Sequence, residues 1–251
     1  MRLTRGFTLT ELAIVLLIVA LLIGGLLMPM SSQVDQRNQA ETQKRLAEIH
    51  DALLGYAAAN GRLPCPAIAG SNGIEDPVGG GVCTSAHGGF LPASTLGVTP
   101  TNAAGFVVDA WNQPIRYAVT KTNNTYDFTT ASGMRTKTIA ALVPDLRVCP
   151  GQVASPITNP GNPTTAACNG ASLSTTAVAV IYSLGRNGAT GGASVDESHN
   201  PNPNSAVAAD RAFISHIESP TTAFGGEFDD LVVWMSPNVL YNRLIAAGQL
   251  P

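Results

Sequence analysis

The sequence predicts an α+β fold, in which a long N-terminal helix with a transmembrane first half packs on a C-terminal antiparallel β-sheet domain. Three observations lead to this prediction. Residues 7–30 form an apolar run whose only ionisable side chain is that of Glu11, and helical spacing of apolar residues continues to Asn60. Beyond Asn60, short strand-like runs alternate with stretches rich in Gly and Pro.

The first element, residues 7–30, has the length of a membrane span, because about 20 apolar residues cross a hydrocarbon core about 30 Å thick. A cleaved secretory signal has a shorter apolar region of about 7–15 residues and a small-residue cleavage site, which does not follow here. Arg2 and Arg5 precede the run without any acidic residue. We therefore expect a single membrane pass with a cytoplasmic N-terminus and an exported chain after Ser31.

Glu11 distinguishes this run from a plain membrane anchor. An acidic side chain in a membrane-spanning helix costs about 2.5–3.5 kcal/mol on insertion scales. Such a residue is retained when it has a partner, so Glu11 is a candidate functional residue.

The N-terminal sequence RGFTLTEL, residues 5–12, resembles the processing signature of type IV pilins and type II secretion pseudopilins. The resemblance implies that residues 1–6 are a prepilin leader peptide, that cleavage falls between Gly6 and Phe7, and that Phe7 is then N-methylated. It also implies that residues 7–30 are the filament-core helix. The expected location is the bacterial inner membrane, followed by a filament in the periplasm or at the cell surface.

The resemblance also implies the partners of the chain. These are other pilin or pseudopilin subunits, a prepilin peptidase/N-methyltransferase, an inner-membrane assembly platform and membrane lipid. Cleavage would leave a charged amine on Phe7, and Glu11 of a neighbouring subunit could neutralise it, because each charge alone in an apolar bundle is costly. Glu11 would then set the axial register between subunits, as one polar residue does in a coiled coil.

The second element, residues 31–60, is predicted to continue the helix with an amphipathic pattern and to end at Gly61. Its apolar residues at helical spacing, expected to pack against a sheet, are Leu46, Ile49, Leu53 and Tyr56. Residues 61–251 are predicted to be an exported, β-rich globular domain with two Cys-containing loops. The strand-like runs there are residues 105–108, 114–119, 126–129, 138–143, 177–183 and 230–235, and residues 239–247 are predicted to form a final helix.

Four cysteines, Cys65, Cys83, Cys149 and Cys168, lie in two Gly- and Pro-rich stretches of the expected exported domain. We expect disulfides, for which three pairings are possible. Pairing of neighbours would close each irregular loop on itself and stabilise the fold by about 3 kcal/mol per bridge. Metal ligation is the alternative, but no C-x-x-C pair is present.

Two further segments resemble those of major pseudopilins. DAWNQPIRY, residues 109–117, is similar to a segment that forms a turn into a strand packed on the long helix. SLGRNG, residues 183–188, with the later Asp229 and Asp230, is similar to a calcium-binding turn and acidic pair. By position the candidate calcium ligands are Asn187, Asp229 and Asp230. The alternative is that these residues bind no metal and belong only to a structural turn and to the start of a strand.

This chain departs from that calcium pattern in two ways. Asn187 stands where the family has Asp, and an insertion, residues 189–228, separates the turn from the acidic pair. The insertion contains Asp196, Glu197 and His199. We expect a solvated loop there, with a contact surface for another subunit or a substrate as the alternative.

Composition excludes other classes of function. The 251 residues include 14 Lys+Arg and 17 Asp+Glu, a formal net charge of -3, which provides no basic surface for nucleic acid. The four histidines are scattered, and the sequence contains no nucleophile elbow, phosphate loop or His-x-x-x-His pair. We therefore expect no enzymatic activity and no cofactor other than calcium.

The sequence thus predicts a structural subunit of a pilin-like filament. A pseudopilin of a type II secretion system is the preferred interpretation. A minor type IV pilin, whose large globular domain is a binding or adhesion module, is the alternative.

Overall fold

The computed structural model describes residues 8–121, 126–151, 168, 172–190, 194, 196–200, 211–223 and 226–250, without the side chains of residues 24–32 and 198. The chain forms two compact units, Met1–Ala40 and Glu41–Pro251. The predicted leader peptide and its cleavage site, Gly6 and Phe7, lie outside the described residues.

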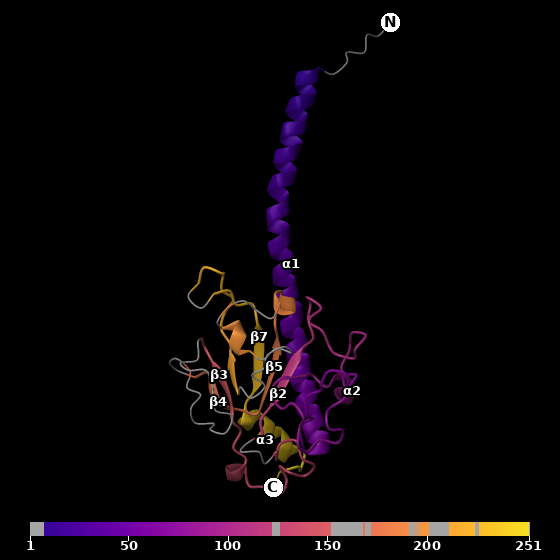
Figure 1. The fold of residues 1–251 in the computed structure, drawn as a ribbon, viewed down its shortest axis with the longest axis vertical. Coiled ribbons are helices and arrows are strands. Elements are labelled where there is room, and N and C mark those ends of the chain that lie inside the picture. Colours follow the sequence, from indigo (N-terminus) through magenta and orange to yellow (C-terminus); the bar gives the residue numbers. More distant parts are fainter. Residues whose placement is uncertain are drawn as a thin grey trace. The chain divides into compact units, whose positions relative to one another are not determined.

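Helix α1 comprises Leu9–Asn60 and has local signals at both ends (Figure 1). At its start the backbone N–H of Thr8 donates to Oε2 of Glu11 (2.9 Å), and the backbone N–H of Glu11 donates to Oγ1 of Thr8 (3.3 Å). These reciprocal bonds form a capping box. At its end Gly61 has a φ of 65°, and its N–H donates to the carbonyl of Ala57. A residue in the left-handed region commonly ends a helix in this way.

Among the described residues, no helix is long and apolar enough to cross a membrane. The predicted transmembrane half of the N-terminal helix is therefore wrong, and so is the single-pass inner-membrane localisation inferred from it.

The described residues of the globular unit form two sheets, so the fold is α+β. The larger sheet has the order β1-β2-β5-β7, in which every pair is antiparallel. Strands β2, β5 and β7 are labelled in Figure 1. Its strands are β1 Gly89–Phe90, β2 Arg116–Val119, β5 Ala179–Ser183 and β7 Leu231–Met235.

The smaller sheet has the order β4-β3-β6, in which β3 and β6 are parallel. Its strands are β3 Leu146–Cys149, β4 Ser174–Ala177 and β6 Ala212–Ile214. The prediction of one antiparallel sheet is therefore corrected, because a long connection between β3 and β6 allows parallel pairing. The remaining elements are α2 Ala93–Leu96, η2 Ile139–Ala141, η3 Gly188–Thr190, η4 Glu197–His199 and α3 Pro237–Ala246.

Alternate residues of the larger sheet belong to two different hydrophobic clusters, as expected for side chains that alternate between the faces of a strand. One cluster joins Tyr117 and Ile181 to Leu46, Ile49 and Leu53 of α1. The other joins strand residues of the opposite face to the smaller sheet; its members are Ala118, Leu146, Val148, Ala177, Val180, Tyr182, Leu184 and Phe213. The larger sheet is thus the middle layer between the Glu41–Asn60 part of α1 and the smaller sheet.

Agreement with the predicted strands varies along the chain. Strands β2, β5 and β7 confirm the runs at 114–119, 177–183 and 230–235, and α3 confirms the final helix. The strand predicted at 138–143 is wrong, since η2 lies there, and residues 126–129 form turns. In residues 105–108 only isolated bridges form. Strands β1, β3, β4 and β6 were not predicted.

Both neighbouring cysteine pairs are disulfides, Cys65–Cys83 and Cys149–Cys168. Glu75, within the loop closed by Cys65–Cys83, forms a buried ion pair with Arg62, which precedes the loop; Nη2 of Arg62 lies 2.6 Å from Oε1 of Glu75. The other carboxylate oxygen of Glu75 accepts the backbone N–H of Cys65 at 3.0 Å. This loop, poor in regular structure, is therefore fixed by a covalent bond and by polar contacts.

Replacing Leu53 by Ala is expected to lower the free energy of unfolding by about 2–5 kcal/mol, because the side chain is fully buried between α1 and the larger sheet. Urea denaturation monitored by circular dichroism measures the change. Val82→Ala is the matched control, since Val82 is 66% exposed, and should change the value by less than about 0.5 kcal/mol. Equal losses in the two variants would contradict the assigned core.

Candidate metal centre

Three buried carboxylates meet at one end of the larger sheet. One carboxylate oxygen from each of Glu197, Asp229 and Asp230 lies within 4.8 Å of the others. The three residues are 2%, 6% and 5% exposed. Glu197 is the first residue of η4, whereas Asp229 and Asp230 immediately precede β7. Carboxylates so close together in a buried position repel one another unless a proton or a cation neutralises them.

The turn after β5 holds Asp229 in place. The backbone N–H groups of Arg186 and Asn187 donate to Oδ2 of Asp229, at 3.1 and 3.3 Å. This approach requires glycine at position 185, where φ is 61° and a Cβ would lie 2.3 Å from Oδ1 of Asp229. The turn therefore supplies backbone donors to one carboxylate oxygen and packs closely against the other.

Asn187 connects this turn to Glu197. Its Nδ2 lies 3.0 Å from each carboxylate oxygen of Glu197 and donates to them. The backbone N–H of Asp229 also donates to Oε1 of Glu197, at 3.1 Å. The structure thus brings the three predicted residues, Asn187, Asp229 and Asp230, together around a fourth residue from the insertion.

Two oxygens of this cluster are buried and have no hydrogen-bond partner among the described residues, Oδ1 of Asn187 and Oδ1 of Asp229. Buried polar atoms are satisfied in the great majority of cases, so these two need an explanation. Calcium takes six to eight oxygen ligands from carboxylates, amide carbonyls, backbone and water. The donor set of Asn187, Glu197, Asp229 and Asp230 fits that requirement, with the remaining ligands to come from backbone or water.

Burial also changes the protonation of the cluster. Burial, together with the charge of Glu197, raises the pKa of Asp229 to about 6. Burial raises the pKa of Asp230 well above its ordinary value, despite a hydrogen bond from Asn200. Without a cation, these carboxyl groups hold protons more tightly than exposed ones, so proton and cation compete for the same oxygens.

Asn200 links the cluster to the smaller sheet. Its Nδ2 donates to Oδ2 of Asp230, and its amide group also exchanges hydrogen bonds with the backbone of Ile214 in β6. One of these bonds, from the N–H of Ile214 to Oδ1 of Asn200, is 2.8 Å long. The cluster therefore joins the start of β7, the end of β6 and the insertion.

Glu197 was not predicted as part of the site. The expectation of a solvated loop is wrong for Asp196 and Glu197, which are 5% and 2% exposed. Asp196 has a side-chain partner of its own, because its Oδ2 lies 3.2 Å from Nε2 of His216. No spacing rule could have identified Glu197, because its contact with Asp229 spans 32 residues.

Residues 109–117, the other segment singled out in the sequence, are hydrogen-bonded to Ser183, which precedes the turn that holds Asp229. Oδ1 of Asp109 accepts the backbone N–H groups of Trp111 and Gln113, at 2.9 and 2.8 Å. Oδ2 of Asp109 accepts the hydroxyl of Ser183, the last residue of β5. Burial raises the pKa of Asp109. The two segments, far apart in sequence, are thus joined by one buried hydrogen bond.

Glu11 lies in the other unit and has a local role. Its Oε2 accepts both the backbone N–H and the hydroxyl of Thr8, at 2.9 and 2.8 Å. These hydrogen bonds lower the pKa of Glu11. The signal for this cap, Thr followed three residues later by Glu, is present in the sequence and was not used in the prediction.

Comparisons of the chain with protein-family models, with curated proteins and with solved structures find no match.

Proposed function

We propose that the chain is a structural subunit of a pilin-like filament, in which the N-terminal part of α1 packs against the same helix of other copies. The observation that carries this proposal is the exposure of eleven large apolar side chains between Leu9 and Ile23, which are 43–86% exposed. Extended apolar surfaces of this kind mark interaction sites.

The expected energy of burying these side chains is of the order that such an assembly needs. Fully burying one Val, Leu or Ile side chain contributes about 1.5–3 kcal/mol. Even half of the lower figure, summed over these eleven side chains, gives about 8 kcal/mol, which is comparable with the association cost of about 4–15 kcal/mol. Contacts with more than one neighbouring helix increase the gain further.

Within this proposal Glu11 sets the register between copies. Both hydrogen bonds from Thr8 end on Oε2 of Glu11, and the carboxylate is exposed in the single chain. After cleavage between Gly6 and Phe7, the N-methylated amine of a neighbouring Phe7 is its proposed partner. An ion pair in an apolar bundle stabilises only the alignment that brings its two members together.

We further propose that the filament is that of a type II secretion system and that Ca²⁺ binds at the cluster of Asn187, Glu197, Asp229 and Asp230. Two observations support these finer assignments. The hydrogen bond between Ser183 and Asp109 joins the two segments that resemble major pseudopilins. The cluster of three carboxylates also contains the Oδ1 atoms of Asn187 and Asp229, which have no hydrogen-bond partner in the part of the chain that the structure describes.

Exchanging Glu11 for Gln tests the register role, because Gln also serves in a capping box but carries no charge. The full chain is co-expressed with a prepilin peptidase, and sheared filaments are examined by electron microscopy and mass spectrometry. The wild type should begin at N-methylated Phe7 and form filaments, whereas E11Q should fold with unchanged Tm and form few. Normal filaments of E11Q would exclude the register role, and an intact leader in wild-type filaments would exclude the processing.

A further inference from the structure

A group of polar and charged side chains gathers where β2 ends and where β3 and β6 begin. Thr120 follows β2, Asp145 precedes β3 and Arg211 precedes β6. Oγ1 of Thr120 donates to Oδ1 of Asp145 at 2.5 Å, and Nη1 of Arg211 donates to Oδ2 of the same carboxylate. Both carboxylate oxygens are therefore engaged, and these bonds fix the three segments to one another.

Two further side chains lie beside this group. The backbone N–H of Val119 donates to the carbonyl of Ala86 at 2.8 Å, which places His87 next to the end of β2. Lys121 is the second residue after β2. Burial lowers the pKa of His87 to about 3, with smaller contributions from the positive charges of Lys121 and Arg211. We call His87, Lys121, Asp145 and Arg211 the cationic cluster.

Two members of the cationic cluster have unused donors. Nε2 of His87 is buried and has no hydrogen-bond partner among the described residues. The ion pair of the cluster joins Arg211 to Asp145, and Lys121 belongs to no ion pair in the described part of the chain. Buried polar atoms are satisfied in the great majority of cases, so the imidazole nitrogen needs an explanation. Two cations and one carboxylate also leave an excess of positive charge.

We infer that the cationic cluster binds a small inorganic oxyanion of the phosphate or sulfate type, held by Lys121, Arg211 and Nε2 of His87. An oxyanion has several acceptor oxygens, so it can accept hydrogen bonds from all three groups at once. Hydrogen bonds from charged donors to such an anion are the strong kind. A neutral imidazole carries its proton on either nitrogen, so Nε2 can act as a donor.

The burial of the cationic cluster favours a small ion over a macromolecular partner. His87 and Arg211 are 2% and 9% exposed, whereas Lys121 and Asp145 are partly exposed. The site therefore opens to solvent beside Lys121 and offers little surface for another protein to contact. A halide ion offers a single acceptor atom, so it is expected to bind more weakly than an oxyanion. The inference does not depend on the proposed filament.

Titration of dispersed full-length subunits with inorganic phosphate tests the inference. A chelator removes calcium, and sodium chloride keeps the ionic strength constant. Differential scanning calorimetry should show a saturable rise in Tm. K121M should raise the apparent Kd for phosphate by about tenfold or more, as expected for the loss of one hydrogen bond from a charged donor. Since Lys121 is partly exposed, K121M should still fold in buffer without phosphate.

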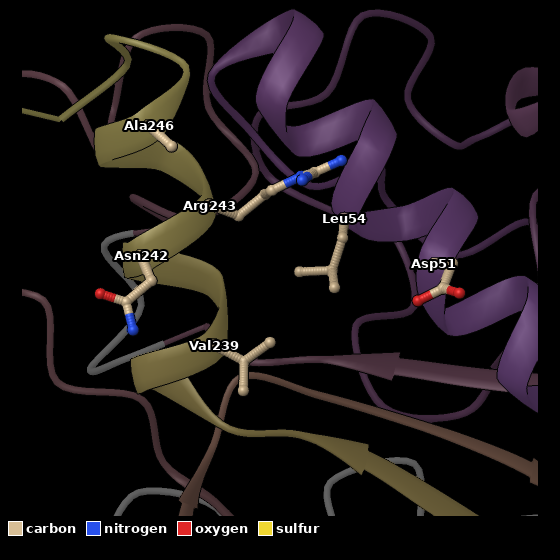
Figure 2. A pocket seen from close by; sticks show the side chains of 6 residues that line it. All are labelled: Asp51, Leu54, Val239, Asn242, Arg243 and Ala246. Atoms are coloured by element: carbon tan, nitrogen blue, oxygen red, sulfur yellow. The ribbon is translucent and has the colours of Figure 1, made fainter.

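The matched control is R243M. Arg243 is an exposed cation that lines the groove between α1 and α3 (Figure 2). It shares the unpaired charge of Lys121, because it belongs to no ion pair in the described residues, but it lies outside the cationic cluster. R243M should therefore bind phosphate with the affinity of the wild type. Equal losses of affinity in K121M and R243M would overturn the site, because they would indicate a general effect of charge.

NMR of histidine-labelled subunits locates the bound anion without a substitution at the buried His87. Saturating phosphate should shift the ring resonances of His87 and leave those of His50, on α1, unchanged. Sulfate should give the same response. A wild-type protein whose Tm shows no saturable response to phosphate, or whose His87 ring does not respond, would overturn the inference.

Discussion

Millimolar Ca²⁺ is expected to raise the Tm of the wild-type protein at pH 7 by about 5–10 °C and to leave the D229N variant unchanged. A ligand present at about 100 times its Kd stabilises the folded state by about 2.7 kcal/mol, and 1 kcal/mol shifts the Tm of a domain of this size by about 2–4 °C. Differential scanning calorimetry with Ca²⁺ or with a chelator measures the shift.

D229N also separates a metal role from a structural one. The substitution keeps the shape of the side chain and an oxygen that can accept the N–H groups of Arg186 and Asn187, but it removes one of three crowded charges. Without calcium, D229N should be at least as stable as the wild type at pH 7. A calcium response equal to that of the wild type would remove Asp229 from the site, and no response in the wild type would remove the site itself.

The calcium response should depend on pH. Because burial raises the pKa of Asp229 in the folded protein to about 6 from its ordinary 3.8, the folded state binds a proton more tightly than the unfolded state. This contribution to stability is complete below about pH 3.8 and is lost as the pH rises through about 6. The calcium-dependent shift in Tm should therefore be small at pH 4.5 and large at pH 7.5, and an equal shift at both would contradict proton–cation competition.

Replacing both Leu16 and Leu17 by Glu is expected to abolish filament assembly and to leave the Tm of the globular unit unchanged. These side chains are 61% and 62% exposed in the single chain and lie outside the globular unit, so the substitutions leave its core intact. In an assembly, each would place an unpaired charge in an apolar bundle, which is strongly unfavourable. Sedimentation of sheared material and negative-stain electron microscopy measure the loss.

The matched control is V78E, which introduces the same charge at an apolar position that is 79% exposed on the globular unit. It should assemble as the wild type does. Normal filaments from the Leu16 and Leu17 variant would show that this part of α1 is not the surface through which copies associate.

The fold could be predicted from the sequence where the signal is local. Leu46, Ile49 and Leu53 recur at helical spacing, and all three lie in the core that α1 forms with the larger sheet. The β-branched runs at β5 and β7 were likewise recognisable. Strand β6 has three residues and pairs in parallel with β3, more than 60 positions earlier, so neither its length nor its partner leaves a local pattern.

The membrane prediction shows the opposite error. Hydropathy was read over residues 7–30 as one run, whereas no helix among the described residues is long and apolar enough to span a membrane. The capping role of Glu11 was missed because its charge was considered only against a membrane. A short motif, Thr8 with Glu11, was the better guide to the local structure.

The candidate site could be predicted only in part. Asn187, Asp229 and Asp230 were identified by their positions relative to a turn and a strand start, and the structure brings them together. Glu197 and Asn200 come from the insertion and join the cluster through tertiary contacts. Such contacts depend on how the insertion folds back, which sequence spacing does not record.

The central claim is that copies of this chain bury the apolar N-terminal part of α1 against one another. The most direct measurement is the rate at which a thiol reagent labels the single added cysteine of L16C, in dispersed subunits and in sedimented assemblies. We predict rapid labelling when dispersed and at least tenfold slower labelling when assembled, while V78C is labelled equally fast in both. Assemblies in which L16C reacts as fast as V78C would contradict the claim.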